Sequence, residues 1–115
     1  MTKAFNRGDI VTVDFEPTRG RETRGTARPA LVVSELAFNR LGLTYVAPIT
    51  QGGSYAREAG FAVPLMGTGT KTQGVVLVGE TKPIDLNERR AKRVESVPEH
   101  VIAEVLARLL PIFGG

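Results

Sequence analysis

The chain has 115 residues, of which 42% are hydrophobic and 23% are charged, and its formal net charge is +3. This length and composition are typical of a single globular domain, here residues 1–115, and exclude a long disordered region. The sequence contains no cysteine, which excludes disulfide bonds and thiolate catalysis. No apolar run marks a signal peptide or approaches the about 20 residues of a membrane-spanning helix, so we expect a cytoplasmic protein without membrane association.

Short apolar runs separated by glycine and proline predict a mainly β fold with short helices. In the first run, Val11, Val13 and Phe15 alternate with polar residues, which indicates a strand with one buried face. The expected strands cover residues 9–15, 30–33, 43–47, 61–63, 74–78, 81–84 and 93–95.

Three helical segments are expected between and after these strands. Ser34 is the candidate N-cap of a short helix over residues 35–40, and Asp85 is that of a further turn or two. Ser96 is the candidate N-cap of a longer helix that ends at about Leu110. The apolar residues of this helix share one face: Val101, Ile102, Val105, Leu106 and Leu109. The predicted architecture is a small, strongly bent sheet or barrel with the last helix packed on it.

The segment between the first two expected strands, residues 17–29, concentrates charge. One carboxylate, Glu22, lies among four arginines: Arg19, Arg21, Arg24 and Arg28. A carboxylate can accept a proton and arginines can stabilise developing negative charge, so this combination suits chemistry on a phosphodiester. The alternative is a solvated charged loop with no chemical role.

A second polar loop covers residues 48–60. Thr50 and Gln51 supply hydrogen-bonding groups there, and Phe61 at its end either stacks on a nucleotide base or lies in the core. The one histidine, His100, stands far in sequence from both loops, so we do not expect it to be catalytic. The sequence has no cysteine–histidine cluster and no closely spaced acidic group, so we expect neither a metal site nor a cofactor.

Five sequence blocks, in order along about residues 7–110, closely resemble the MazF/PemK toxins of type II toxin–antitoxin systems. Within that family, the blocks are most similar to those of the ChpB and Kid subgroup. The blocks are GDIVTVDFEPTRGRETRGTARPALVVS, VAPITQGG, AREAGFAV, TQGVVLV and KPIDLNERRAKR. The resemblance implies an SH3-like barrel, a homodimer, and a metal-independent, sequence-specific endoribonuclease that cleaves single-stranded RNA such as mRNA and thereby inhibits translation and growth. It also implies a cognate antitoxin with an acidic, partly disordered segment.

The same resemblance assigns candidate catalytic residues. The family's loop glutamate falls on Glu22, the arginine of its Arg-Pro pair on Arg28, and its phosphate-side threonine on Thr50. The candidate RNA-binding residues are Arg19, Arg21, Arg24, Gln51, Ala59, Phe61, Gln73 and Lys82. Kid-like members carry an arginine and an aspartate where this sequence has Leu77 and Gly79, so only the Glu/Arg arrangement of MazF remains.

This set of residues agrees with the chemistry of RNA cleavage. RNA carries its own nucleophile, the ribose 2′-OH, so an enzyme needs a base, positive charge at the phosphorus and in-line geometry. Glu22 is the expected base. Arg28 is the expected electrostatic stabiliser rather than an acid, because arginine keeps its proton. The expected products are a 2′,3′-cyclic phosphate and a 5′-OH.

Two other functions remain open at this stage. A CcdB-like protein shares the barrel but inhibits DNA gyrase through protein contact, without nuclease chemistry. A small RNA-binding barrel would hold RNA without cutting it. Neither alternative requires Glu22 or Arg28 as a catalytic group.

Overall fold

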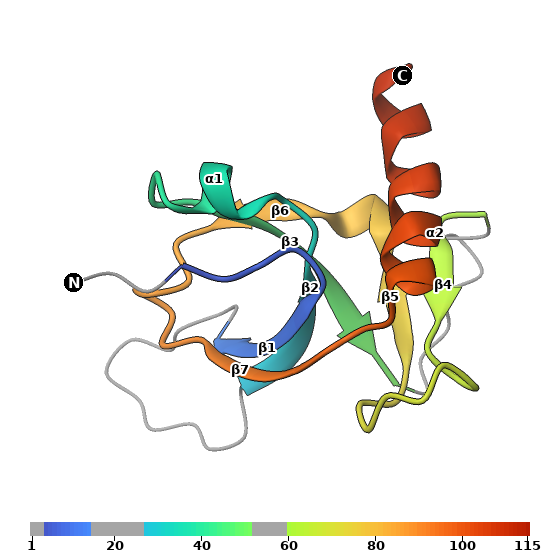
Figure 1. The fold of residues 1–115 in the computed structure, drawn as a ribbon, viewed down its shortest axis with the longest axis horizontal. Helices are drawn as coiled ribbons and strands as arrows, with labels where there is room; N and C mark the ends of the chain where they lie inside the picture. The colour runs from blue at the N-terminus through green and yellow to red at the C-terminus, as the bar shows by residue number, and fades with distance from the viewer. Residues whose placement is uncertain (1–3, 15–26, 52–59) are drawn as a thin grey trace.

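The computed structural model describes residues 4–14, 27–51 and 60–115 (Figure 1). Within these ranges the strands, all paired antiparallel, are β1 (Asp9–Asp14), β2 (Ala27–Val32), β3 (Thr44–Thr50), β4 (Ala62–Pro64), β5 (Val75–Leu77), β6 (Lys82–Ile84) and β7 (Lys92–Ser96). The helices are α1 (Leu36–Asn39) and α2 (Glu99–Leu109), with single 3-10 turns η2 (Val78–Glu80) and η3 (Leu110–Phe113). The predicted mainly β fold with a C-terminal helix is confirmed. No helix in the described ranges is long and apolar enough to cross a membrane.

Strand β3 organises the sheet. The strand order is β4-β5-β3-β2-β1-β7, and β6 also pairs with β3. The start of β3, residues 44–46, pairs with β6, its middle pairs with β2, and its last residues, Ile49 and Thr50, pair with β5. Because one strand pairs with three others, the sheet bends around β3 into the barrel-like arrangement of Figure 1.

The core consists of two clusters on the two faces of this bent sheet. On β2, Leu31 belongs to the cluster covered by α2, whereas Ala30 and Val32 belong to the other cluster. This alternation follows from the two-residue period of a strand. The predicted apolar face of α2 is confirmed, because Val101, Val105 and Leu109 are buried in the first cluster and Ile102 and Leu106 pack against it.

The predicted cap of α1 is wrong. The Ser34 hydroxyl accepts a hydrogen bond from the backbone N–H of Tyr45 at 2.9 Å and donates one to the Asn39 side chain. Glu35 is instead the N-cap residue, and no side chain caps the helix. Ser34 thus connects α1 to the start of β3.

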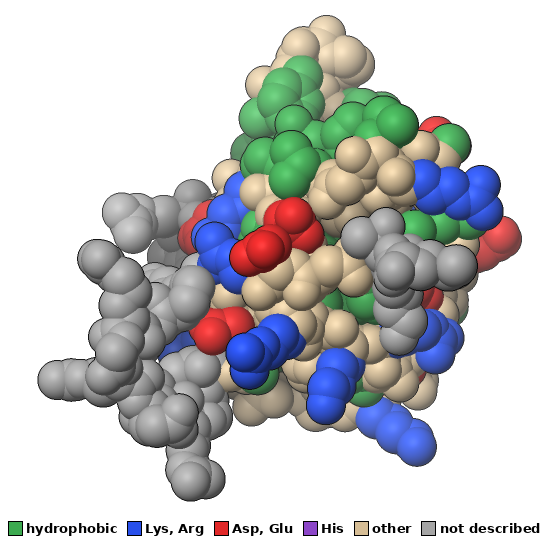
Figure 2. All heavy atoms as spheres, turned by 90° about the vertical axis from the view of Figure 1, so that its left-hand side faces the viewer, with side chains coloured by type: hydrophobic (Ala, Val, Ile, Leu, Met, Phe, Trp, Pro, Cys, Tyr) green, Lys and Arg blue, Asp and Glu red, His purple; other side chains and the backbone are tan. Residues whose placement is uncertain are grey.

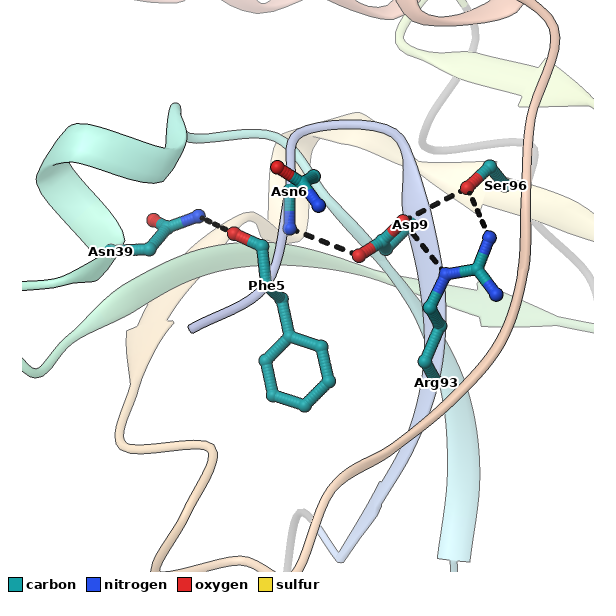
Figure 3. A network of polar contacts seen from close by, with 6 residues as sticks. All are labelled: Phe5, Asn6, Asp9, Asn39, Arg93 and Ser96. Atoms are coloured by element: carbon teal, nitrogen blue, oxygen red, sulfur yellow. Dashed lines mark hydrogen bonds and ion pairs between the residues drawn. The ribbon is translucent and has the colours of Figure 1, made fainter. Parts of the chain in front are cut away.

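The predicted cap of α2 is also wrong, because the Ser96 hydroxyl hydrogen-bonds residues outside the helix. The helix begins after Pro98, and the Ser96 hydroxyl donates to Asp9 Oδ1 at 2.9 Å and accepts from Arg93 at 2.7 Å. Asp9 is buried and also accepts hydrogen bonds from Arg93 Nε at 3.2 Å and from the backbone N–H of Asn6 at 2.9 Å (Figure 3). This network fixes the start of β1 against β7.

Other boundaries also differ from the predictions. Strand β2 begins at Ala27 rather than at Ala30, so Arg28 lies on a strand and not in the charged loop. Pro48 does not end its strand but pairs with Ala30 inside the sheet, so β3 continues to Thr50. The strand expected to reach Val78 ends one residue earlier, and η2 follows. The predicted cap at Asp85 is confirmed, because its Oδ1 accepts a hydrogen bond from the Glu88 N–H at 3.1 Å, and residues 86–90 form the turn that follows.

Candidate functional site

Some of the predicted site residues lie outside the described residues. They are Arg19, Arg21, Glu22, Arg24 and Ala59. The structure places the remaining candidates: Arg28, Thr50, Gln51, Phe61, Gln73 and Lys82.

Arg28 and Thr50 come to the same end of the sheet. Arg28 is exposed on β2 and pairs with Val13, one residue before the end of β1. The register of β2 with β3 pairs Ala30 with Pro48, so two residues further along each strand stand Arg28 and Thr50. The printed pairing ends at Ala30 and Pro48, so Arg28 and Thr50 lie beyond the paired residues, where the ends of β2 and β3 diverge (Figure 1).

The side chains of Arg28 and Thr50 also share one face. Because side chains alternate along a strand, Arg28 lies on the same face of β2 as Ala30, and Thr50 lies on the same face of β3 as Val46. Ala30 and Val46 belong to the same core cluster. A cation and a hydroxyl group thus lie on one face at one end of the sheet, which suits an anionic group such as a phosphate.

Gln51 and Gln73 meet beside Thr50. The Gln51 Nε2 group donates a hydrogen bond to the backbone oxygen of Gln73 at 3.3 Å, and Thr50 pairs with Val75. Both glutamine side chains are exposed, so their remaining polar atoms are accessible to a ligand. Three of the predicted residues are therefore adjacent: Thr50, Gln51 and Gln73. Arg28 lies at the same end of the sheet on β2.

Phe61 and Lys82 do not join this group. Phe61 precedes β4, which is separated from β3 by β5, and its side chain is 36% exposed rather than buried in the core. Lys82 pairs with Val46, four residues before Thr50, which corresponds to about 13 Å along the strand. The RNA-binding role predicted for these two residues has no geometric link to Arg28.

Gly74 is a site residue that the sequence analysis missed. Its φ is +126°, and a Cβ atom at this position would lie 2.5 Å from the Thr50 backbone oxygen. No other residue type fits so close to Thr50 without moving it. The sequence pattern that could have identified it is a single glycine directly before an apolar strand, because such glycines often mark a close backbone approach.

Glu95 supports the segment that contains Gly74. Its Oε2 atom accepts hydrogen bonds from the Thr72 backbone N–H and hydroxyl group, both at 2.7 Å, and Oε1 accepts one from the Lys71 N–H at 3.1 Å. Burial raises the pKa of Glu95, but the hydrogen bonds from Thr72 and Lys71 and the charge of Lys71 together outweigh it, so the net shift is downward. The carboxylate is therefore ionised at neutral pH.

The basic residues at the two ends of β1 are partly structural. Arg89 Nη1 donates to the Asp14 backbone oxygen at 2.9 Å, and Arg93 pairs with Asp9 at 3.2 Å. Figure 2 shows basic and acidic side chains mixed on one face of the molecule rather than a stripe of one sign. Among the described residues, no three His, Cys, Asp or Glu side chains form a group that could hold a metal ion.

A sequence model described as the PemK-like, MazF-like toxin of type II toxin–antitoxin system matches residues 6–113. The endoribonuclease toxin ChpB of Escherichia coli strain K12 is 53% identical over 105 residues, which cover 91% of this chain and 90% of that protein. The endoribonuclease PemK of Escherichia coli is 50% identical over 109 residues, which cover 94% and 81%.

Solved structures give the same result. MazF of Deinococcus radiodurans has 33% sequence identity and a TM-score of 0.78, with 99% of this chain and all of that chain covered. A chain from a MazE–MazF structure of the same organism has 31% identity and a TM-score of 0.75, with 98% of each chain covered. The family resemblance seen in the sequence is confirmed.

Proposed function

This chain belongs to the PemK-like, MazF-like toxins of type II toxin–antitoxin systems, and we propose that it is an endoribonuclease that cleaves single-stranded RNA. The observation that supports the proposal is that the register of β2 with β3 directs Arg28 and Thr50 to the same end of the sheet. The segment that contains Glu22 connects Asp14 to Ala27, and these two residues pair at the same end. The proposed base is therefore connected to the strand that carries the proposed stabilising cation.

In the proposed reaction, Glu22 removes the proton from the ribose 2′-OH. The 2′-oxygen then forms a bond to the adjacent phosphorus, and the bond from phosphorus to the 5′-oxygen breaks. The products are a 2′,3′-cyclic phosphate and a 5′-oxygen that takes a proton from water or another group. DNA is not a substrate, because it lacks the 2′-hydroxyl.

Arg28 and Thr50 act on the phosphate in this scheme. The Arg28 guanidinium neutralises the negative charge that develops on the pentavalent phosphorus, and it does so without giving up its proton. The Thr50 hydroxyl donates a hydrogen bond to a non-bridging oxygen. Both residues belong to strands of one sheet, so their backbones are fixed before RNA binds, which lowers the entropic cost of aligning the phosphate.

RNA binding involves the residues around this group. The exposed amides of Gln51 and Gln73 supply donors and acceptors for base edges, which is how single-stranded RNA is read. Arg19, Arg21 and Arg24 supply positive charge for the RNA backbone, with Ala59, Phe61 and Lys82 as outer contacts. No cofactor and no metal ion take part in the proposed reaction.

Two protein partners complete the proposal for this protein in the cytoplasm: a cognate antitoxin with an acidic, partly disordered segment, and a second copy of this chain. The solved MazE–MazF structure of a relative supports the antitoxin. The last turn of the chain exposes apolar residues, including Phe113 at 76% exposure, and such groups are typical of interaction surfaces. Light scattering is expected to give about twice the mass of 12.4 kDa, and a mass near that of one chain would contradict the homodimer.

Incubation with a long unstructured RNA in EDTA separates the three functions that the sequence left open. We expect discrete fragments at recurring short sequences. Binding without cleavage would favour the RNA-binding barrel, and neither binding nor cleavage, combined with gyrase inhibition, would favour the CcdB-like protein. The relatives at 53% and 50% identity are named endoribonucleases, which supports the first outcome.

A further inference from the structure

Hydrogen bonds from threonine side chains stabilise the segment between β4 and β5, residues 65–74. Thr68 Oγ1 donates to the Leu65 backbone oxygen at 2.6 Å, and Thr70 Oγ1 donates to the Thr72 backbone oxygen at 2.8 Å. The two ends are joined by a hydrogen bond from the Leu65 N–H to the Gly74 oxygen at 2.9 Å. The segment is therefore a defined unit, and a displacement at Thr72 is transmitted to Gly74, two residues away.

Glu95 attaches this unit to the far side of the sheet. Glu95 lies on β7, which stands at the opposite end of the strand order from β4 and β5. One carboxylate receives three hydrogen bonds from Lys71 and Thr72, two of them at 2.7 Å. Hydrogen bonds to an ionised acceptor are the stronger kind, so this contact joins the two ends of the strand order.

The unit held by Glu95 ends against Thr50. The absent Cβ of Gly74 would lie 2.5 Å from the Thr50 backbone oxygen and 3.1 Å from Ile49 Cγ2, so the backbone of Gly74 lies directly against Thr50. The next residue, Val75, pairs with Thr50, and the Gln73 oxygen accepts the hydrogen bond from Gln51. Residues 73–75 therefore contact both Thr50 and Gln51.

We propose that Glu95 is a positioning residue for the cleavage site, which acts through Thr72 and Gly74 to place the Thr50 hydroxyl and the Gln51 amide. This inference rests on the proposed function, because Thr50 is the group that contacts the scissile phosphate. Glu95 itself does not touch RNA in this scheme. Its role is to keep the β4–β5 segment, and with it the end of β3, in one position relative to Arg28.

Thr72→Val tests the proposal with a matched control. Valine keeps the shape of threonine but removes the hydroxyl hydrogen bond to Glu95. At the neighbouring position on β7, Ser96→Ala removes hydroxyl hydrogen bonds to Asp9 and from Arg93, and neither partner belongs to the β4–β5 segment. For a short RNA that contains a mapped cleavage site, we expect Thr72→Val to lower kcat about tenfold with KM changed less than about twofold.

The control and the conservative variant define the contradicting result. Ser96→Ala is expected to keep the kcat of the unsubstituted protein, and Thr72→Ser, which retains a hydroxyl group, is expected to restore it. In Glu95→Gln, the amide oxygen can keep the hydrogen bonds from Thr72, and only the hydrogen bond from the Lys71 N–H is lost. The kcat of Glu95→Gln should therefore fall between those of the unsubstituted protein and Thr72→Val. Equal kcat for Thr72→Val and Ser96→Ala at matched melting temperature would overturn the proposal.

A second measurement separates this inference from the proposed function. Amide chemical shifts of Thr50 and Gln51 should change in Thr72→Val and remain unchanged in Ser96→Ala. If the unsubstituted protein does not cleave RNA, the proposed function fails, and these shifts still decide whether Glu95 positions the end of β3. Unchanged shifts in Thr72→Val would overturn the positioning role even in a protein that cleaves.

Discussion

The two strand ends that carry Arg28 and Thr50 are held in different ways. Arg28 projects into solvent from β2, and only the strand pairing of its backbone fixes it. Thr50 ends β3 with Gly74 packed on its backbone and with Glu95 supporting the Gly74 segment from β7. The difference indicates that charge can be removed from β2 without disturbing the fold, whereas changes beside Thr50 affect stability and activity together.

Removing charge from the β2 side should have the largest effect on activity. We expect Arg28→Ala and Glu22→Gln each to lower the cleavage rate about 100- to 1,000-fold, because one electrostatic or proton-transfer contact in a transition state is worth about that much. The melting temperature of Arg28→Ala should remain unchanged, since the side chain is exposed. Arg40→Ala, which removes another exposed arginine near α1, is the control and should cleave normally.

Adding one methyl group beside Thr50, at the end of β3, should lower both stability and activity. Gly74→Ala places a carbon atom against the Thr50 oxygen, so we expect a loss of at least about 2 kcal/mol in the free energy of unfolding and about a tenfold lower kcat. Gly69→Ala is matched, because its φ is also positive, at +92°, but nothing lies within 4 Å of the added carbon. If both variants lose the same stability and activity, the contact with Thr50 has no special role.

Substituting the predicted RNA-binding residues that lie away from Thr50 should affect cleavage less. Phe61→Ala and Lys82→Ala are expected to raise KM a few-fold at most and to leave kcat unchanged, because neither lies beside Thr50. Steady-state kinetics on one mapped RNA site measures both constants. A hundredfold loss of kcat in either variant would mean that RNA brings these residues to the phosphate.

The smallest expected effect is the dependence of stability on pH. Because the pKa of Glu95 is lowered in the folded protein, its stabilising contribution is complete above its ordinary value of about 4.5 and is lost as the pH falls through the folded value. Glu95→Gln should therefore show a shallower fall in melting temperature on acidification than the unsubstituted protein. Equal slopes would show that protonation of this carboxylate does not contribute.

The sequence predicts those parts of the fold that depend on local patterns. Apolar alternation locates β1, and the stripe that includes Val101 and Val105 predicts the buried face of α2. The caps at Ser34 and Ser96 could not be predicted, because their hydroxyl groups bind residues that are distant in sequence, such as Tyr45 and Asp9. A local spacing rule does not account for such competition.

The site could be predicted only in part. Family resemblance points to Arg28 and Thr50, but their placement at one end of the sheet depends on the β2–β3 register, which residue types alone do not fix. Gly74 and Glu95 gave no local signal strong enough to distinguish them from ordinary turn and strand residues. Their importance arises from contacts between segments more than 20 residues apart.

One measurement tests most directly the claim that the nucleophile at the proposed site is the 2′-hydroxyl of the RNA itself. A short RNA with a mapped cleavage site is synthesised with a single 2′-deoxy nucleotide on the 5′ side of the scissile phosphate. Cleavage in EDTA should stop at that phosphate, while the unmodified RNA should yield a 2′,3′-cyclic phosphate and a 5′-OH. Continued cleavage of the deoxy-substituted RNA at the same phosphate would contradict the mechanism proposed for Glu22, Arg28 and Thr50.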